Sequence, residues 1–479
     1  MPLLRSLAVL PLLLCHAAWA YAAQLHHDLV VSLDPDNSSI EVTDTITLPT
    51  GSNSLVFLLH PGLQPALLPG EAQLVRLPNP AAQESNAPER YRVTLPPGLN
   101  SFSLRYHGRI RHALQQQGEE YARSFRVTRG MISPEGVFLS GSGYWYPHVE
   151  EQLLTFDLEL DLPANWKGMS QGDRLDPPAD AHTTGERWRC TSPQEEIYLI
   201  AGPFTEYTSM ENGVQAMALL RRPDPALAQK YLDATHRYIK LYDGLIGPYP
   251  FGKFAMVENF WETGYGMPSF TLLGPKVIRL PFILNSSYPH EILHNWWGNG
   301  VYVDYASGNW AEGLTSYLAD HLIKEQQGRG AGYRRTTLQK YADYVSRQED
   351  FPLTAFRSRH SARTEAVGYG KTLMLFHMLR WKLGDDRFIE GLQSLYRQYR
   401  FRVVDFATVQ RVFSEVAQQP LDVFFAQWVE RTGAPELRAS RVRAEPRGDG
   451  YRLTAVIEQT QPGEPYDLSL IHISEPTRL

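Results

Sequence analysis

The stretch Tyr288-Pro289-His290-Glu291-Ile292-Leu293-His294-Asn295-Trp296-Trp297-Gly298 is the most informative part of the chain for its fold and its chemistry. Residues four positions apart lie on nearly the same face of a helix, so His290 and His294 can reach one metal ion with Glu291 beside them. A helix break follows at Gly298, and a carboxylate stands on the next helical run. The stretch therefore predicts a helix that carries two of the ligands of a metal site.

The third candidate ligand is Glu312, which lies eighteen positions beyond His294. Two neutral imidazoles and one carboxylate leave a position on Zn²⁺ open for water, as in catalytic zinc sites. Such a zinc ion lowers the pKa of its water towards ~7, and Glu291 is placed to accept the proton and pass it to a leaving amine. Glu312 can also close a capping box with Asn309, and the two roles are compatible. We therefore predict one Zn²⁺ ion and a zinc hydrolase.

Length and composition indicate an ordinary globular protein with two or three domains. The 479 residues are 43% apolar and 20% charged, and the formal net charge is −6. A mildly acidic chain without a basic stripe gives no indication of nucleic-acid binding or of attachment to a membrane surface. No apolar run of about 18 residues follows the N-terminal segment, so we expect no transmembrane helix.

The N-terminus has the features of a targeting segment. A positive residue, the apolar run 7–14 and a small-x-small site at 18–20 predict a signal peptide over residues 1–20. We therefore expect an exported protein, either periplasmic or secreted. Cys15 raises a lipid anchor as an alternative, which the bulky residue before it disfavours. Removal of the signal peptide leaves Cys190 alone, so the mature chain has no disulfide framework.

Residues 24–205 have the pattern of an antiparallel β-domain. Between 154 and 162, apolar residues alternate with Thr, Asp and Glu, the period of two that is typical of a half-buried strand. The same alternation occurs from 40 to 48, after a turn-forming segment at 34–37. Breaks rich in Pro, Gly and Asn separate these runs, which favours a β-domain over a helical one.

From 206 to 435 the signals are mostly helical. Asp224 followed by Pro225 marks a helix start, because an N-cap precedes proline at the first helical position. Residues 247–274 form an irregular stretch that is rich in aromatic residues and glycine. Helical patterns then dominate from 288 to 431, and the metal motif lies among them.

Alternation typical of strands resumes around Tyr451, which indicates that a third, β-type domain starts within 436–467. Residues 468–479 resemble the translation of a transposase adapter used in preparing sequencing libraries. We expect this segment to be an artefact and the natural protein to continue differently after about Asp467. The third domain is then truncated.

Two segments carry a family resemblance: His290-Glu291-Ile292-Leu293-His294-Asn295-Trp296-Trp297-Gly298-Asn299 and Asn309-Trp310-Ala311-Glu312-Gly313. They are similar to the gluzincin aminopeptidases, the family that contains membrane alanyl aminopeptidase and leukotriene hydrolase. The resemblance implies a multidomain α+β fold, with an antiparallel β-saddle, a thermolysin-like, mostly helical zinc peptidase domain and a β-sandwich. It also implies peptide or protein substrates.

The resemblance assigns roles to single residues as well. His290, His294 and Glu312 would bind zinc, and Glu291 would be the general base. Tyr369, in Tyr369-Gly370-Lys371, would be the tyrosine that stabilises the transition state. A phenol with a pKa of about 10 stays protonated at neutral pH and can donate to the developing oxyanion.

One family motif, G-x-M-E-N, is altered in this chain. The corresponding stretch is Gly264-Tyr265-Gly266-Met267-Pro268-Ser269, and Pro268 stands where the family has a glutamate. That glutamate holds the free α-ammonium group of the substrate, which proline cannot do. Gly266 and Met267 would still contact substrate, and Glu258 or Glu262 is a candidate replacement for the missing carboxylate.

These observations predict a zinc metallopeptidase, with an aminopeptidase as its leading form. The first alternative is an endopeptidase or another hydrolase that does not select a free amine, because of Pro268. The second alternative is a catalytically silent peptide-binding protein. The presence of the complete set of ligands, base and tyrosine favours an enzyme over the silent protein.

Overall fold

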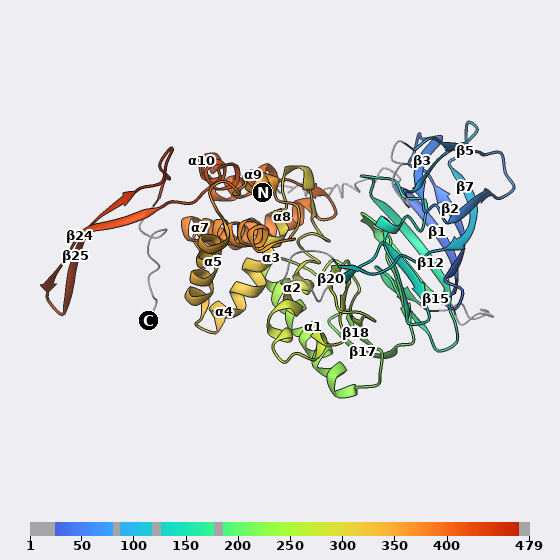
Figure 1. Cartoon of the computed structure of the whole chain (residues 1–479), viewed down its shortest axis with the longest axis horizontal. Helices are drawn as coiled ribbons and strands as arrows, with labels where there is room; N and C mark the ends of the chain where they lie inside the picture. The colour runs from blue at the N-terminus through green and yellow to red at the C-terminus, as the bar shows by residue number, and fades with distance from the viewer. Residues whose placement is uncertain (1–23, 80–86, 117–125, 177–184, 469–479) are drawn as a thin grey trace, which may run out of the picture.

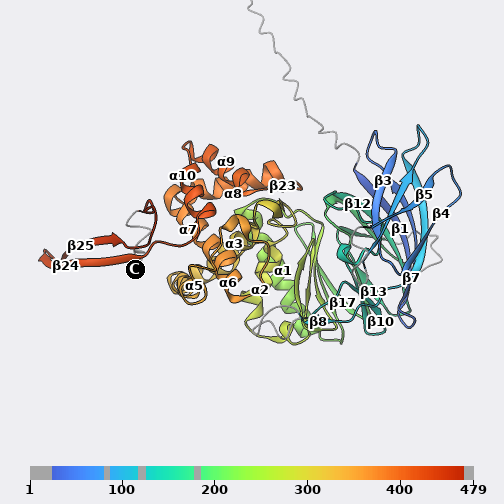
Figure 2. The same ribbon diagram turned by 45° about the horizontal axis from the view of Figure 1, so that its top comes forward.

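The computed structural model describes residues 24–79, 87–116, 126–176 and 185–468. The predicted signal peptide lies outside these residues, as does the adapter-like segment apart from its first residue. Figures 1 and 2 show three parts in a row: a β-rich N-terminal part, a middle part of helices and strands, and a long C-terminal hairpin. The predicted multidomain α+β fold class is confirmed.

The N-terminal part is built around a seven-stranded sheet in which buried and exposed side chains alternate along the strands. The order of its strands from edge to edge is β14-β15-β12-β1-β2-β7-β4. The pairing of β1 with β12 is parallel, and all other strand pairs of this sheet are antiparallel. The strands are β1 (Leu25–Asp34), β2 (Ser39–Thr47), β4 (Leu63–Leu67), β7 (Ser101–Arg109), β12 (Leu154–Asp161), β14 (Asp173–Leu175) and β15 (Glu186–Gln194).

Three smaller sheets complete this part of the described chain. One is β3 (Ser54–Leu59), β6 (Glu89–Thr94) and β5 (Gln73–Leu77), and another is the pair β8 (Gln115–Gln116) and β9 (Arg126–Val127). The third is β10 (Gly130–Ser133), β11 (Gly136–Leu139), β16 (Leu199–Gly202) and β13 (Lys167–Met169), with the short 3₁₀ helix η2 (Gly141–Gly143) after β11. This third sheet matters for the site, because the segments at its end reach the metal motif.

A five-stranded sheet joins the N-terminal part to the helices. Its order is β17-β18-β19-β21-β20, and the strands are β17 (Thr205–Glu211), β18 (Val214–Leu220), β19 (Lys253–Glu258), β20 (Gly264–Met267) and β21 (Phe270–Leu273). Three of these strands come from 247–274, which the sequence presented as irregular. β19 and β21 are buried at every position and so lose the alternation of apolar and polar residues, which hid the pattern of these strands.

Both faces of this sheet are packed against protein. Ala216, Ala218 and Leu220 belong to the core shared with the helices. Met217 and Leu219, which alternate with them along β18, belong to the core of the N-terminal part. The sheet is therefore a buried layer between two cores, which fixes the N-terminal part against the helices.

The first helix lies between β18 and β19 in the chain and begins as predicted, and the other helices follow the sheet. Asp224 caps α1 (Pro225–Leu245) by accepting a hydrogen bond from the amide of Leu227 at 2.9 Å, with Pro225 in the first turn. The other helices are α2 (Ser287–Leu293), α3 (Ala311–Ser316), α4 (Leu322–Gln326), α5 (Gly330–Tyr344), α6 (Ala362–Glu365), α7 (Thr372–Leu383), α8 (Asp385–Tyr399), α9 (Phe406–Ala417) and α10 (Asp422–Phe425).

Shorter elements lie between these helices. Three have π-helical turns, namely η6 (Tyr317–His321), η8 (Ala366–Lys371) and η9 (Ala426–Glu430). The 3₁₀ turns are η3 (Val277–Arg279), η4 (Ile283–Asn285), η5 (Tyr305–Ser307) and η7 (Leu353–Ala355), and β22 (Tyr302–Val303) pairs with β23 (Val403–Val404). Single π-turns inside α-helices are frequent at functional sites.

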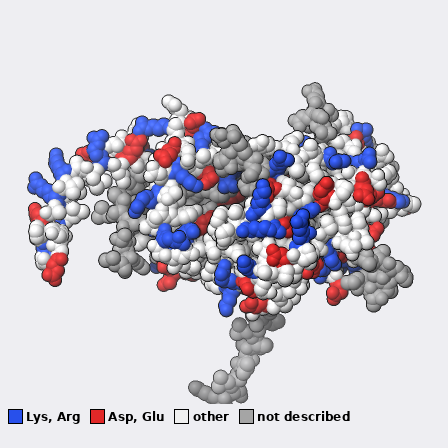
Figure 3. Space-filling view, turned by 60° about the horizontal axis from the view of Figure 1, so that its bottom comes forward, with Lys and Arg blue, Asp and Glu red and all other residues white. Residues whose placement is uncertain are grey.

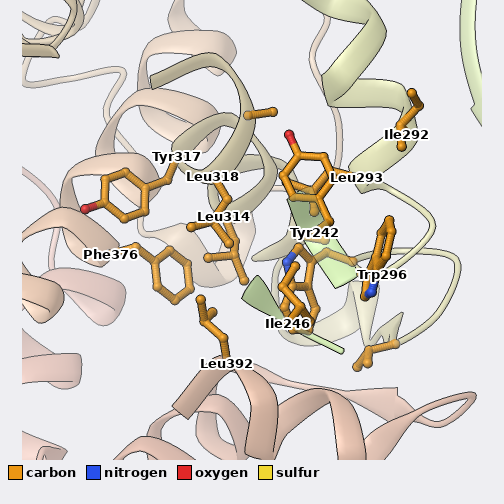
Figure 4. Packing of buried hydrophobic residues seen from close by; sticks show 14 of the residues in the cluster. Tyr242, Ile246, Ile292, Leu293, Trp296, Leu314, Tyr317, Leu318, Phe376 and Leu392 are labelled. Carbon is orange, nitrogen blue, oxygen red and sulfur yellow. The ribbon is translucent and has the colours of Figure 1, made fainter. Parts of the chain in front are cut away.

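The helix of the metal motif is anchored by its apolar side. Ile292 and Leu293 are fully buried, and Trp296 just beyond the helix packs against Tyr242 of α1 with ring centroids 5.6 Å apart. Figure 4 shows these side chains in one cluster that also takes in Leu314 of the next helix. This packing holds α2 and α3 in a fixed relative position.

The C-terminal hairpin extends away from the helices in Figures 1 and 2. It consists of β24 (Leu437–Arg447) and β25 (Gly450–Gln459), and large apolar side chains such as Tyr451 and Leu453 are exposed on it. This is the β-type segment that the alternation around Tyr451 predicted. Within the described residues, the helices are all too short or too polar to span a bilayer.

Candidate active site

The two histidines of the motif come together at the end of α2. Their ring centroids are 4.7 Å apart, and Nε2 of His290 lies 3.1 Å from Nε2 of His294. The helix ends at Leu293, and Gly298 then adopts a positive φ of 110°, a conformation that favours glycine. The local sequence therefore both aims the imidazoles and turns the chain away after them.

Glu312, in the first turn of α3, meets the two imidazoles. Its Oε2 lies 3.5 Å from Nε2 of His290 and 3.4 Å from Nε2 of His294. The three candidate ligand atoms lie within 4.8 Å of one another, close enough to share one ion. The capping contact is also present, because Asn309 Oδ1 accepts from the amide of Glu312 at 3.4 Å.

The hydrogen bonds behind the imidazoles show that this cluster suits a cation. Nδ1 of His294 lies 2.9 Å from the carbonyl oxygen of Trp297, and Nδ1 of His290 lies 2.9 Å from Oδ2 of Asp320. Both partners are acceptors, so both Nδ1 atoms donate, and in neutral rings both Nε2 atoms then present lone pairs. Two lone pairs 3.1 Å apart need a positive charge between them.

The carboxylate of Glu312 gives the same indication. Its Oε2 is buried and receives no hydrogen bond, although both Nε2 atoms lie within 3.5 Å of it. Burial alone would raise the pKa of Glu312, but His294 and His290 outweigh it and hold the pKa well below its usual value. The donor set of two imidazole nitrogens and one carboxylate oxygen is one that Zn²⁺ prefers. The residues present therefore fit the predicted zinc ion.

Glu291 points into the same space from the next position of α2. Gly266 of β20 lies so close that a Cβ atom on it would stand 2.4 Å from Oε2 of Glu291. Burial raises the pKa of Glu291, although His290 and His294 act in the opposite direction. A carboxylate with a raised pKa is a better proton acceptor than an ordinary one, which suits a general base.

Tyr369 reaches the cluster from the π-helical turn η8. Its ring is stacked at 16° to the ring of His290, with centroids 6.4 Å apart. Burial, reinforced by Glu312, raises the pKa of the Tyr369 hydroxyl well above its usual value. The phenol therefore keeps its proton and can donate it in a hydrogen bond to an oxyanion.

These side chains face a cavity of about 680 Å³ that is lined by several parts of the chain. The N-terminal part contributes Ser140, Ser142, Glu196 and Tyr198, and β20 contributes Gly266 and Met267. Helix α5 contributes Tyr333, Thr337 and Lys340. A cavity of this size can hold a short peptide beside the metal cluster.

The predicted substrate-binding residues have different surroundings. Gly266 and Met267 both line the cavity, although Met267 is only 3% exposed and belongs mostly to the core. Glu258 does not line the cavity, because its oxygens accept from the amide of Arg221 at 2.8 Å and from Arg279 at 2.7 Å. Glu262 accepts from the amide of Lys276 at 3.0 Å and also lies outside the cavity lining. Neither carboxylate is placed to replace the one missing at Pro268.

Two acidic residues of the site, Asp320 and Glu196, were not predicted from the sequence. Asp320 was detectable in principle, since a metal-bound histidine usually donates its other nitrogen to a carboxylate. Glu196 was not detectable, because it lies far from the motif in sequence and no local pattern connects the two. It approaches the site only through the packing of the N-terminal part against the helices.

A comparison with protein families agrees with this geometry. Residues 285–428 match the Peptidase family M1 domain. Aminopeptidase N of Lactococcus lactis subsp. lactis is 22% identical over 394 residues, which are 75% of this chain and 46% of that protein. Aminopeptidase M1-D of Oryza sativa subsp. japonica is 25% identical over 222 residues, which are 43% of this chain and 25% of that protein. The chain thus spans less than half the length of these relatives.

Solved structures share the fold. An M1 zinc metallopeptidase mutant from Deinococcus radiodurans, bound to a Tyr-Ser-Ala substrate, has a TM-score of 0.62 and 21% identity, covering 86% of this chain and 95% of that one. Native yeast LTA4 hydrolase also has a TM-score of 0.62, with 16% identity and coverage of 86% and 68%. The family resemblance drawn from the motifs is confirmed, and the M1 zinc metallopeptidases use one zinc ion.

Proposed function

We propose that this chain, whose residues 285–428 match the Peptidase family M1 domain, is a zinc-dependent aminopeptidase. One observation carries the proposal: His290, His294 and Glu312 converge on one point, with Glu291 and Tyr369 beside it in the same cavity. The lone pairs at that point call for a cation. The base and the phenol are the two other groups that hydrolysis of a peptide bond requires.

The proposed chemistry divides the work among the side chains. Zinc, when bound, lowers the pKa of its water and polarises the peptide carbonyl. Glu291 accepts the proton of the attacking water and delivers it to the departing amine. Tyr369 donates a hydrogen bond to the oxygen that becomes negative. Asp320 holds the ring of His290 in the orientation that the ligand role needs.

The preference for a free N-terminus rests on Glu196. Its Oε2 accepts from the amide of Gly141 at 2.5 Å and its Oε1 accepts from the hydroxyl of Tyr198 at 2.6 Å. These donors and the amide of Ser142 fix the carboxylate at the cavity wall, and a carboxylate has room for one further donor beside them. Burial raises the pKa of Glu196, so its charged form is costly when nothing cationic is near. A substrate ammonium group would supply that cation.

The alternative of an endopeptidase is favoured by Pro268 and by the positions of Glu258 and Glu262 outside the cavity lining. The two readings differ in one measurable property. An aminopeptidase requires the free amine, whereas an endopeptidase cleaves an N-acetylated peptide as well.

The test compares a short peptide and its N-acetylated form on the zinc-loaded protein, with zinc content measured in the same sample. We expect cleavage of the free-amine peptide only. Glu196→Gln should lower kcat/KM for that peptide by about ten- to a hundredfold, the effect of removing a charge-assisted contact. The matched control is Glu150→Gln, because that side chain is an exposed carboxylate of the same N-terminal part and does not line the cavity.

Equal cleavage of both peptides by the wild-type protein would support the endopeptidase. Loaded zinc without cleavage of a broad peptide panel would support the silent peptide-binding protein.

Export belongs to the same proposal and rests on residues 1–20, which lie outside the described residues. The mass of the protein recovered from its native compartment tests it, since we expect loss of that segment. An intact N-terminus in the cytoplasm would contradict export.

A further inference from the structure

The segment that carries Glu196 is held by the side chain of Gln171. Nε2 of Gln171 donates to the carbonyl oxygen of Glu196 at 2.5 Å, and its Oε1 accepts from the amide of Tyr198 at 2.9 Å. Gln171 is fully buried and lies between β13 and β14 in the chain. One side-chain amide therefore bonds to the backbone on both sides of Ile197, in the way that a neighbouring strand would.

Two aromatic side chains bind the backbone of Ile197 itself. The hydroxyl of Tyr146 accepts from the amide of Ile197 at 3.2 Å, and Nε1 of Trp145 donates to the carbonyl oxygen of Ile197 at 3.0 Å. Both aromatic residues are fully buried. The position of Glu196 therefore depends on single side chains that come from other segments of the N-terminal part.

Ser170, next to Gln171, connects the same segment to a buried lysine. Its Oγ donates to the carbonyl oxygen of Tyr198 at 2.7 Å, and its own carbonyl oxygen accepts from Nζ of Lys253 at 2.7 Å. Figure 3 shows Lys and Arg side chains spread over one face of the molecule, which is where lysine is usually found. Lys253 is only 2% exposed, and burial lowers the pKa of its amine well below the usual value. A buried amine is costly unless its hydrogens are bonded, so its partners matter.

Lys253 also binds the turn that contains the altered family motif. Its Nζ donates to Oγ of Ser269 at 2.7 Å and to the carbonyl oxygen of Ser269 at 3.2 Å. With the carbonyl of Ser170, these acceptors engage all three N–H donors of an ammonium group. Ser269 follows Pro268 and has a positive φ of 66°, a conformation that is uncommon for serine. Lys253 therefore joins the loop of Ser170 to the turn at the end of β20.

Asn295 continues this connection to the helix of the base. Its Oδ1 accepts from the amide of Ser269 at 2.7 Å. Its Nδ2 donates to the carbonyl oxygen of Glu291 at 3.3 Å and to that of Ile292 at 2.9 Å. Asn295 is fully buried. Buried hydrogen bonds, linked through the residues that make them, therefore connect the backbone of Glu196 with the backbone of Glu291.

We propose that Gln171 and Lys253 are positioning residues, which hold Glu196 at a fixed place relative to Glu291. This inference rests on the proposed aminopeptidase function, in which Glu196 binds the substrate amine and Glu291 acts at the first peptide bond. These two points of a peptide have the same separation whatever its side chains are. The anchor and the base must keep a matching separation, because a small misplacement of reacting groups costs much of the rate.

The experiment is a double-mutant cycle on the zinc-loaded protein, with kcat/KM for a free-amine tripeptide as the measured quantity. The variants are Gln171→Met, Glu196→Gln and the two together, because methionine keeps the length of the side chain and removes its polar atoms. Gln171→Met alone should lower kcat/KM about five- to thirtyfold, since the anchor is misplaced. In the Glu196→Gln background it should lower kcat/KM less than about twofold, since Gln171 acts through a charge that is already absent.

Two further variants test the rest of the connection. Ser170→Ala removes only the hydroxyl, so the carbonyl bonded to Lys253 stays in place. It should lower kcat/KM about two- to fivefold, the effect of one hydrogen bond, and only where Glu196 is present. Lys253→Met removes the bonds to Ser269 and should lower kcat/KM about five- to thirtyfold, with a smaller loss in the Glu196→Gln background. Zinc content should be unchanged in all of them, because none of the ligands is replaced.

Gln427→Met is the matched control, because Gln427 makes the same pair of bonds in another part of the protein. Its Nε2 donates to the carbonyl oxygen of Asp467 at 3.2 Å, and its Oε1 accepts from the amide of Asp467 at 2.6 Å. Gln427 is also buried, and it does not line the cavity of the metal cluster. We expect this variant to lower the melting temperature and to leave kcat/KM within about twofold of the wild-type value.

The outcomes separate this inference from the function on which it rests. Equal losses from Gln171→Met in both backgrounds would overturn the inference and leave Glu196 as the anchor, as would an unchanged kcat/KM in Gln171→Met. If Gln171→Met fails to fold, Ser170→Ala decides by the same cycle. Full activity of Glu196→Gln would instead remove the proposed amine anchor, and the inference with it.

Discussion

The metal cluster and the cavity walls are built in contrasting ways. All the side chains around the metal position except Tyr369 come from residues 290–320. Helical spacing pairs His290 with His294, and the packing of α2 against the next helices brings Glu312 and Asp320 to them. The walls come from segments far apart in the chain, with Glu196 beside β16 and Lys340 on α5. The residues proposed to carry out the chemistry therefore lie mostly within one short stretch of sequence. The residues proposed to select the substrate meet only when distant elements pack together.

Removal of the base is the strongest test of the cluster. Glu291→Ala should retain zinc, because none of the ligands changes, and should lower kcat by about a hundred- to ten-thousandfold. The measurement is zinc content together with kcat on the free-amine peptide. A zinc-loaded variant with full activity would take Glu291 out of the mechanism.

Loss of the phenol hydroxyl should have a somewhat smaller effect. Tyr369→Phe keeps the ring that stacks on His290 and removes only the donor to the oxyanion. We expect kcat to fall about a hundred- to a thousandfold with little change in KM. A rise in KM at constant kcat would instead make Tyr369 a binding residue.

The next prediction concerns Gly266 in the cavity wall, which lies close to the carboxylate of Glu291. Gly266→Ala would place a methyl group 2.4 Å from the present position of Oε2 of Glu291, the mobile end of a side chain. The base must move while the fold need not, so we expect kcat to fall about ten- to a hundredfold at nearly unchanged thermal stability. Gly264→Ala on the same strand is the control, since its nearest neighbour stands at 4.0 Å. Equal kcat in the two variants would contradict a tight fit around Glu291.

The smallest effect is expected for Asp320, which accepts a hydrogen bond from the zinc-ligand candidate His290. Asp320→Asn keeps a hydrogen-bonding group near Nδ1 of His290 but removes its charge. Zinc affinity should fall about ten- to a hundredfold, and activity at saturating zinc should fall less. Competition with a metal chelator measures the affinity. An unchanged affinity would show that the carboxylate adds nothing to His290 as a ligand.

The same contrast explains how much the sequence predicted. The helix spacing, the cap at Asp224 and the alternation in the N-terminal strands are local signals, and the structure has these elements where they were expected. The pairing of His290 with His294 follows from the spacing of the motif, and Glu312 joins them through the packing of α3 against α2. Tyr369 was found only through the family resemblance, because a single tyrosine has no signal of its own.

What the sequence did not predict depends on tertiary packing. In the five-stranded sheet, β19 and β21 were hidden because strands buried at every position carry no alternation. Glu258 and Glu262 were close in sequence to the altered motif, and that closeness made them candidates to hold the substrate amine. Their side chains instead bond to neighbouring loops and to Arg279, while the carboxylate that does reach the cavity belongs to another part of the chain.

The buried five-stranded sheet also has a consequence for how the protein unfolds. The two faces of β18 belong to two different cores. Separating the β-rich part from the helices would therefore expose Met217 and Leu219 to water. Neither half keeps a complete interior without the other. We expect the two to melt in one cooperative transition, and a protein shortened to begin at residue 206 to aggregate rather than fold.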